Sequence, residues 1–249
     1  MEFVRLSIQE GIAEVRLERG KVNALDDRVV DELSVTFREL ADDARVRAAI
    51  LTGTGKFFSF GFDIPKLLGY SKDAFAEYLG RFTGLYRELY AHPKPVVAAL
   101  NGHAVAGGCM LATACDARIM AAGKAKVGLN ELGFASSVFA GSVAILTSLV
   151  GARRAQEILY GGKLYSAEEA LSLGLVDAVV SEDHLLDAAR DLARRHGTQA
   201  PAAFRSMKEL LRRPVLEDIC AREPQSIRDF LEIWYSEPTW KQLQKIEIR

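Results

Sequence analysis

The stretch of sequence that decides the fold is residues 94–116, KPVVAALNGHAVAGGCMLATACD. Its first half, residues 95–100, is a short apolar run bounded by turn-forming residues, a pattern typical of a buried strand. Its second half opens with Gly107 and Gly108 and continues with small apolar residues, which predicts a short helix over 107–114. No charged residue lies between Pro95 and Cys115, so we expect both elements in the interior.

Alternating strand and helix patterns extend in both directions from this stretch. Short apolar or alternating runs predict strands over 3–8, 12–17, 47–51, 95–100, 117–121 and 175–180. Apolar residues at helical spacing predict a helix that starts within 23–26 and ends near 42, and another over 74–91. The rest of the chain beyond residue 134 is expected to be mostly helical. Strands that alternate with helices predict an α/β fold.

The composition excludes several classes of protein. The 249 residues include 32 basic and 33 acidic side chains, a net charge of -1, so we expect no nucleic-acid partner, because such binding relies on many basic contacts to phosphate. Three cysteines without a CxxC pair indicate a reducing, cytoplasmic location. Glu2 and Arg5 interrupt the N-terminal region, and no secretory signal is expected there.

Two charge-free stretches, 95–115 and 133–151, need a test as membrane spans. A spanning helix requires about 20 mainly apolar residues. Both stretches are instead interrupted by glycine and by polar residues such as Asn101. We therefore expect no contact with a membrane, and we assign both stretches to the buried core.

The motifs of common enzyme classes are absent. Residues 53–56, GTGK, lack the spacing of a phosphate-binding loop, and the chain has neither an HExxH nor a GxSxG motif. The four histidines are scattered and show no metal-ligand spacing. A metal enzyme and a serine hydrolase are therefore not expected.

Two glycine-containing loops could present backbone amides to a ligand. Gly61 lies in a loop between a predicted strand and a helix, and glycine permits backbone angles that other residues avoid. Gly107 and Gly108 open a predicted helix, whose first amide groups have no partner within the helix. One amide from each loop would form an oxyanion hole, a pair of donors that stabilises negative charge on a carbonyl oxygen.

A single carboxylic acid, Glu131, lies in the largely apolar stretch from Ala125 to Gly151. Partial burial would raise the pKa of its carboxyl toward the range that suits proton transfer near neutral pH. Taken alone, the pair Gly107 and Gly108 could simply serve helix packing, and Glu131 could be a solvated loop residue. The three features matter because they occur together.

These residues resemble the crotonase superfamily, the enoyl-CoA hydratases and isomerases. The resemblance rests on residues 94–116, on FSFGFDI over 58–64, on VNAL over 22–25 and on LYSAEEALSLGLVD over 164–177. The motifs are collinear over roughly residues 1–195. The resemblance implies an α/β fold built as a spiral of ββα turns, an acyl-CoA thioester as the substrate, and no separate cofactor or metal, because CoA is part of the substrate.

The resemblance also assigns roles to residues at matching positions. The backbone amides of Phe62 and Gly107 would bind the thioester oxygen. The residues expected to line the channel for CoA and the substrate are Val22, Ala24, Phe60, Ile64 and Gly108. Phe60 replaces a residue that is usually small, which affects the expected shape of the channel.

One departure from the family pattern selects the reaction. Hydratases of this family use two glutamates, and here the first position is Met110 while the second is Glu131. Moving a double bond needs only one base, so we expect an isomerase that converts a 3-enoyl-CoA to a 2-trans-enoyl-CoA, similar to the Δ3,Δ2-enoyl-CoA isomerases. The alternatives are a hydratase, lyase or hydrolase of the same superfamily, and a non-catalytic protein that binds CoA esters.

The C-terminal region suggests oligomers. We expect a spiral core over 1–195 and a helical oligomerisation region over 196–249, by resemblance to a family that forms trimers and hexamers that are dimers of trimers. The region is rich in large apolar residues, namely Phe230, Leu231, Trp234, Tyr235, Trp240 and Leu243. Packing on the same chain and packing at a subunit interface, where aromatic residues are enriched, remain equal alternatives for this set.

Overall fold

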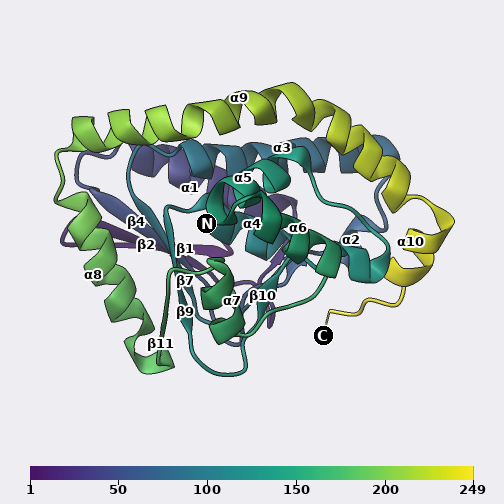
Figure 1. Ribbon diagram of the computed structural model, residues 1–249, viewed down its shortest axis with the longest axis horizontal. Coiled ribbons are helices and arrows are strands. Elements are labelled where there is room, and N and C mark those ends of the chain that lie inside the picture. Colours follow the sequence, from purple (N-terminus) through teal and green to yellow (C-terminus); the bar gives the residue numbers. More distant parts are fainter. Residues whose placement is uncertain (249) are drawn as a thin grey trace.

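Two neighbouring β-sheets of mostly parallel strands form the centre of the molecule (Figure 1). The computed structural model describes residues 1–248. The larger sheet has six strands, in the order β1 (Val4–Gln9), β2 (Ile12–Leu17), β4 (Ala48–Thr52), β7 (Val96–Leu100), β9 (Ala117–Ala121) and β11 (Ala178–Val180). β1 and β2 form an antiparallel hairpin, and the later pairs are parallel.

A smaller sheet runs beside the larger one in the same order. It consists of β10 (Val127–Gly128), β8 (His103–Val105) and β5 (Phe57–Ser59), and the short strands β3 (Ala24–Leu25) and β6 (Gly61–Phe62) pair next to it. The chain repeatedly passes from a strand of the larger sheet to a strand of the smaller sheet and then into helix. β4, β5 and α3 (Lys72–Ala91) form one such turn, and β7, β8 and α4 (Gly107–Ala114) form the next. The predicted spiral of ββα turns is confirmed.

The corner between β7 and β8 shows why successive turns stack so closely. Asn101 accepts a hydrogen bond from the Gly53 amide at 2.8 Å and donates one to the Gly55 carbonyl at 3.0 Å. A Cβ added at Gly102 would lie 2.2 Å from the carbonyl oxygen of Lys56. A side chain cannot be accommodated there, so this glycine sets the spacing between the two turns.

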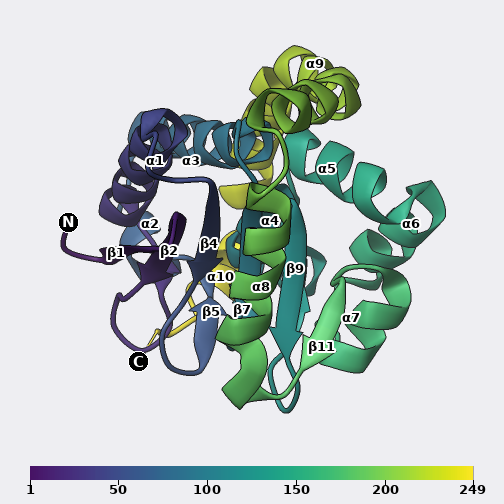
Figure 2. The same cartoon turned by 90° about the vertical axis from the view of Figure 1, so that its left-hand side faces the viewer.

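Helices cover both faces of the larger sheet. α1 (Asp27–Asp42), α3 and the long α9 (Pro201–Trp234) lie on one side, together with α5 (Ala140–Val150) (Figure 1). α8 (Leu185–Gly197) covers the other face (Figure 2). Its small residues Ala189 and Ala193 are fully buried against that face, which includes Ile50 and Val97. The remaining helical elements are α2 (Ile64–Leu67), the 3-10 helix η1 (Glu131–Phe134), α6 (Ala152–Gly161), α7 (Ala167–Leu173), the 3-10 helix η2 (Glu182–His184) and α10 (Glu237–Leu243).

The aromatic C-terminal region packs on its own chain. Phe230, Leu231 and Trp234 are at most 4% exposed, and the Trp234 ring lies 4.6 Å from that of Phe75 on α3. Leu243 of α10 is fully buried as well. The interface alternative is therefore wrong for these four residues, because the chain itself buries them. α9 packs against α3 and α5, and α10 packs against α9 and η1.

A buried ion cluster fixes α9 to the end of the larger sheet. Lys208 and Arg212 of α9 contact the carboxylate of Asp116 at 2.7 and 2.9 Å. The same carboxylate accepts a hydrogen bond from the Val96 amide at 2.7 Å, at the start of β7. Within residues 1–248, no helix is both long and apolar enough to cross a membrane.

Candidate active site

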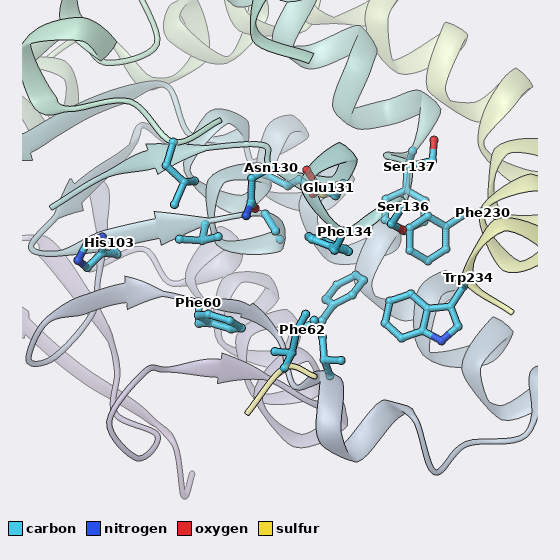
Figure 3. Close-up of a pocket in the computed structure, with 18 of the residues that line it drawn as sticks. Phe60, Phe62, His103, Asn130, Glu131, Phe134, Ser136, Ser137, Phe230 and Trp234 are labelled. Atoms are coloured by element: carbon cyan, nitrogen blue, oxygen red, sulfur yellow. The ribbon is translucent and has the colours of Figure 1, made fainter. Parts of the chain in front are cut away.

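A cavity of about 390 Å³ lies where the smaller sheet, η1 and α9 meet (Figure 3). Five of the predicted site residues line it, and they come from three separate parts of the chain. They are Phe60, Phe62, Ile64, Gly107 and Glu131. The fold therefore brings both predicted amide loops and the predicted base to one cavity.

The two segments predicted to supply backbone amides are in direct contact. Gly61 has a φ of +94°, and a Cβ added there would lie 2.8 Å from the Val105 carbonyl oxygen and 3.0 Å from the Gly107 nitrogen. Only glycine combines this φ with so close an approach. Phe62 and Gly107 both line the cavity, and a Cβ added at Gly107 would lie 3.3 Å from the Phe62 ring. The two residues expected to supply amide donors thus lie side by side at the cavity wall.

The backbone is strained at the residue directly before Gly107. Ala106, the residue before α4, has a φ of +50° and a ψ of −118°. Alanine rarely adopts such a conformation, which costs of order 1–3 kcal/mol and persists only where the surroundings impose it. Its amide donates to the Gly128 carbonyl at 2.9 Å, and this bond to β10 holds the start of α4 beside the cavity.

Glu131 provides a buried carboxyl in the cavity. Only 6% of its surface is exposed, and its Oε2 has no hydrogen-bond partner among the described residues. Because burial removes the carboxylate from water, the pKa of Glu131 is raised to about 8. Of the described residues that line the cavity, it is the only carboxylic acid. Such a group can accept and return a proton near neutral pH.

Met110 lies in the same cavity, on α4, and is 3% exposed. Its thioether is at most a weak hydrogen-bond acceptor and carries no transferable proton. The position at which a second glutamate would stand is therefore filled by an apolar side chain, and the described cavity offers one proton-handling carboxyl.

The residues predicted to line the CoA channel separate into three groups. Phe60 and Ile64 line the cavity itself. Val22 and Ala24 line a neighbouring cavity of about 520 Å³, together with Arg19 and Lys21. Residues at the start of α2 line both cavities, since Ile64 lines the first one and its neighbours Asp63 and Pro65 line the second.

Gly108 has a different environment. A Cβ added there would lie 2.4 Å from the Ser59 carbonyl oxygen, and Gly108 is not among the residues that line the described cavities. This glycine allows α4 to pack against β5. Its expected contact with the substrate stays a prediction.

Aromatic rings form both ends of the cavity. At one end, the rings of Phe57 and Phe60 are 6.1 Å apart, and His103 lies 5.0 Å from Phe57. At the other end, the rings of Phe139 and Phe230 are 4.5 Å apart. Figure 3 shows Glu131 between the two ends.

Several residues of the second end were missed as site residues. Ser136, Phe139, Phe230 and Trp234 all line the cavity. Phe230 and Trp234 were assigned only to packing or to an interface, because nothing in the local sequence connects α9 with the cavity. Ser136 lies in the charge-free stretch 133–151, which was assigned to the core as a whole.

A second cavity, of about 410 Å³, lies on the other side of the base. Its wall includes Glu131, Ser136 and Ser137, which also line the first cavity. The rest of its wall is mostly apolar and comes largely from α5 and α6, with residues such as Val143 and Leu159. Glu131 therefore lies between two spaces that an apolar chain could occupy.

Comparisons with known proteins identify the family of this chain. A family model described as enoyl-CoA hydratase/isomerase matches residues 7–231. Carnitinyl-CoA dehydratase from Salmonella arizonae is 39% identical over 214 residues, which cover 85% of this chain and 80% of the relative. The protein of the same name from Citrobacter koseri is 40% identical over 204 residues, 81% of this chain and 77% of the relative.

One solved structure with a similar fold belongs to a protein that is named for a different activity. The crystal structure of human mitochondrial Δ3,Δ2-enoyl-CoA isomerase has a TM-score of 0.93 with this chain. The two are 27% identical, and the match covers 97% of this chain and 95% of the human one. The named relatives thus include both a dehydratase and an isomerase.

Proposed function

Because the chain belongs to the enoyl-CoA hydratase/isomerase family, we propose that it is an isomerase that moves the double bond of a 3-enoyl-CoA to the 2-trans position. The observation that carries this proposal is the single carboxyl of Glu131, with Met110 at the place of a second one, in the cavity that Phe62 and Gly107 line. A double-bond shift is the family reaction that needs one acid-base group.

The proposed mechanism moves one proton within the substrate, so the product has the same composition as the substrate. The ionised Glu131 carboxylate removes a proton from C2, and the electron pair of that C–H bond moves into the thioester to give a dienolate. The amides of Phe62 and Gly107 donate hydrogen bonds to the enolate oxygen, and losing one such donor typically costs about 3 kcal/mol of activation energy. Glu131 then returns the proton to C4, and the double bond is left between C2 and C3.

Dehydration of a 3-hydroxyacyl-CoA is the second candidate, and the relatives named carnitinyl-CoA dehydratase favour it. That reaction also begins with removal of the C2 proton. It further requires a proton for the departing hydroxyl, and each general acid–base contribution is worth about 10²- to 10⁴-fold in rate. Met110 cannot supply that proton, so we rank this reaction second.

Assays on three substrates separate the candidates. We expect the purified protein to isomerise 3-hexenoyl-CoA, to hydrate crotonyl-CoA poorly and to leave carnitinyl-CoA unchanged, and we expect Glu131→Gln to abolish the isomerisation. Rapid turnover of crotonyl-CoA or carnitinyl-CoA would instead assign a hydratase or dehydratase. Binding of CoA esters without any turnover would indicate a non-catalytic binding protein.

We further propose that the protein works without a separate cofactor, in the cytoplasm, as a homotrimer or a dimer of trimers. Support for the oligomer comes from α9, which leaves Met207, Leu210 and Leu211 between 58% and 78% exposed. Grouped apolar side chains of this kind are typical of surfaces that another protein covers. α9 lies along the outside of the molecule, where a second copy can reach it (Figure 2).

A further inference from the structure

Ser136 carries a buried hydroxyl that the proposed reaction does not use. Only 3% of the residue is exposed, and its Oγ has no hydrogen-bond partner within residues 1–248. Its backbone N–H donates to the Glu131 carbonyl at 2.9 Å, so its position relative to the base is fixed. A buried polar group left unpaired costs about 1–3 kcal/mol, and a bound ligand that pairs with it would recover that cost.

The hydroxyl lies where the acyl chain must pass. In Figure 3, His103 and Phe60 are at one end of the cavity, Glu131 is in the middle, and Ser136 lies next to Phe230 at the other end. Phe60 is expected to line the channel for CoA, which places the CoA moiety at that end. A thioester held at Gly107, with its C2 at Glu131, then directs the remaining carbons toward Ser136 or into the second cavity. Ser136 lines both cavities, so the chain passes this residue in either case.

A second unpaired group lies at the same end. Trp234 is 1% exposed and lines the first cavity, and its Nε1 also has no partner among the described residues. The indole N–H can only donate a hydrogen bond, and the Ser136 hydroxyl can donate as well as accept. The complementary group on a ligand is therefore a hydrogen-bond acceptor, that is, an oxygen atom.

The charges of the cavity indicate that this oxygen is neutral. No lysine or arginine is among the described residues that line the first cavity, and His103 lies at its other end. Burial and the nearby Lys126 lower the pKa of His103, which leaves the ring uncharged at neutral pH. A carboxylate at Ser136 would be buried without a countercharge, which is strongly unfavourable.

We propose that this site selects acyl-CoA thioesters whose acyl chain carries a neutral oxygen, as a carbonyl or a hydroxyl, beyond C3, and that the Ser136 hydroxyl binds this oxygen. The inference rests on the proposed function in one respect, the placement of the thioester beside Glu131. It does not require that the protein catalyse isomerisation.

Saturated ligands, which cannot react, test the proposal by calorimetric binding. The probes are hexanoyl-CoA, 4-oxohexanoyl-CoA, 5-oxohexanoyl-CoA and adipoyl-CoA, whose chain has six carbons and ends in a carboxylate. The proteins are the wild type, Ser136→Ala and the matched control Ser34→Ala. The control removes another buried serine hydroxyl, on α1, from a residue that lines neither cavity.

We expect the wild type to bind at least one oxo ligand about 5- to 10-fold more tightly than hexanoyl-CoA, the effect of one net hydrogen bond. We expect Ser136→Ala to lose this preference and Ser34→Ala to keep it. The proposal is overturned if the wild type shows no preference, if it prefers adipoyl-CoA, or if Ser136→Ala keeps the preference. If a variant fails to fold, the affinities of the wild type for the oxo ligands, hexanoyl-CoA and adipoyl-CoA still test the proposal. The binding data also remain valid if the protein shows no isomerase activity.

Discussion

Gly61 and Gly107 are so close that a methyl group on Gly61 would lie 3.0 Å from the Gly107 nitrogen. The two residues belong to different turns of the spiral, and they meet because β5 and β8 pair in the smaller sheet. The position of the proposed oxyanion hole is thus a direct consequence of sheet pairing, and it should respond to any side chain inserted at this contact.

Substituting Gly61 tests this contact. We expect Gly61→Ala to lower kcat/KM at least about 100-fold, because the added methyl group separates the two proposed donor segments. Gly55→Ala is the matched control, since Gly55 also has a positive φ, +66°, but no atom within 4 Å of an added Cβ. Both variants should lose stability in thermal unfolding. Equal activity in the two variants would show that the contact is irrelevant to catalysis.

The pH dependence of activity follows from the buried base. Glu131 must be ionised to remove a proton, and burial raises its pKa to about 8. We expect kcat/KM to rise about tenfold per pH unit below that value and to level off above it. Initial rates on 3-hexenoyl-CoA from pH 5.5 to 9.5 would measure this. A flat profile between pH 6 and 8 would contradict the assignment of Glu131 as the base.

The same carboxyl also links stability to pH. The pKa of Glu131 is about 8 in the folded protein, against an ordinary value of 4.5, so the folded state binds the proton more tightly than the unfolded state. Ionisation therefore costs stability as the pH rises from about 4.5, and the full cost is present above pH 8. We expect Glu131→Gln to be more stable than the wild type at pH 8.5, by more than about 1 kcal/mol, and to match it at pH 4.5.

Chemical denaturation at the two pH values measures this difference. The control is Glu157→Gln, which removes an exposed glutamate on α6. Its stability relative to the wild type should be the same at both pH values. A Glu131→Gln variant that is less stable than the wild type at pH 8.5 would mean that the ionised carboxylate is well paired in the folded protein.

A second carboxyl at Met110 should add a second reaction. We expect Met110→Glu to hydrate crotonyl-CoA at least about 100 times faster than the wild type, because addition of water can then use two proton-handling groups. Met110→Gln has nearly the same shape but carries no acidic proton, and it should not gain this activity. If both variants stay inactive as hydratases, Met110 does not determine the choice of reaction.

The exposed part of α9 should control assembly. Leu210 and Leu211 are 65% and 78% exposed, and we expect Leu211→Glu, alone or with Leu210→Glu, to convert trimers or larger species to monomers in light scattering. Leu171→Glu changes a 45% exposed leucine on α7 and serves as the control. A wild-type protein that is monomeric at micromolar concentration would refute the proposed oligomer.

The parts of the fold that are continuous in sequence could be predicted from it. The strand over 117–121 and the helix over 107–114 were predicted with the bounds that the structure has, because apolar and small residues dominate each segment. The predicted strand over 175–180 was too long, since it begins at Ala178 and the residues before it close α7. Strands of two residues, such as β6 and β10, were not predicted, because such short pieces show no periodicity.

Only the part of the candidate site that depends on local sequence could be predicted. The glycine loops and Glu131 were recognisable, because their chemistry is encoded in local residue types, and the fold brings them together at one cavity. The contribution of Trp234 was not recognisable, since it depends on how α9 packs across α3 and α5. The unpaired hydroxyl of Ser136 was likewise invisible, because only the packed structure shows that no protein group reaches it.

The late position of Phe230 and Trp234 in the chain has a consequence for biosynthesis. The ribosome releases Gly61, Gly107 and Glu131 well before it releases α9, and folding generally proceeds from the N-terminal side during synthesis. A nascent or prematurely terminated chain can therefore carry the proposed base and oxyanion segments while it lacks the wall that would enclose an acyl group. The release of α9 from the ribosome is then the step that allows the pocket to become selective.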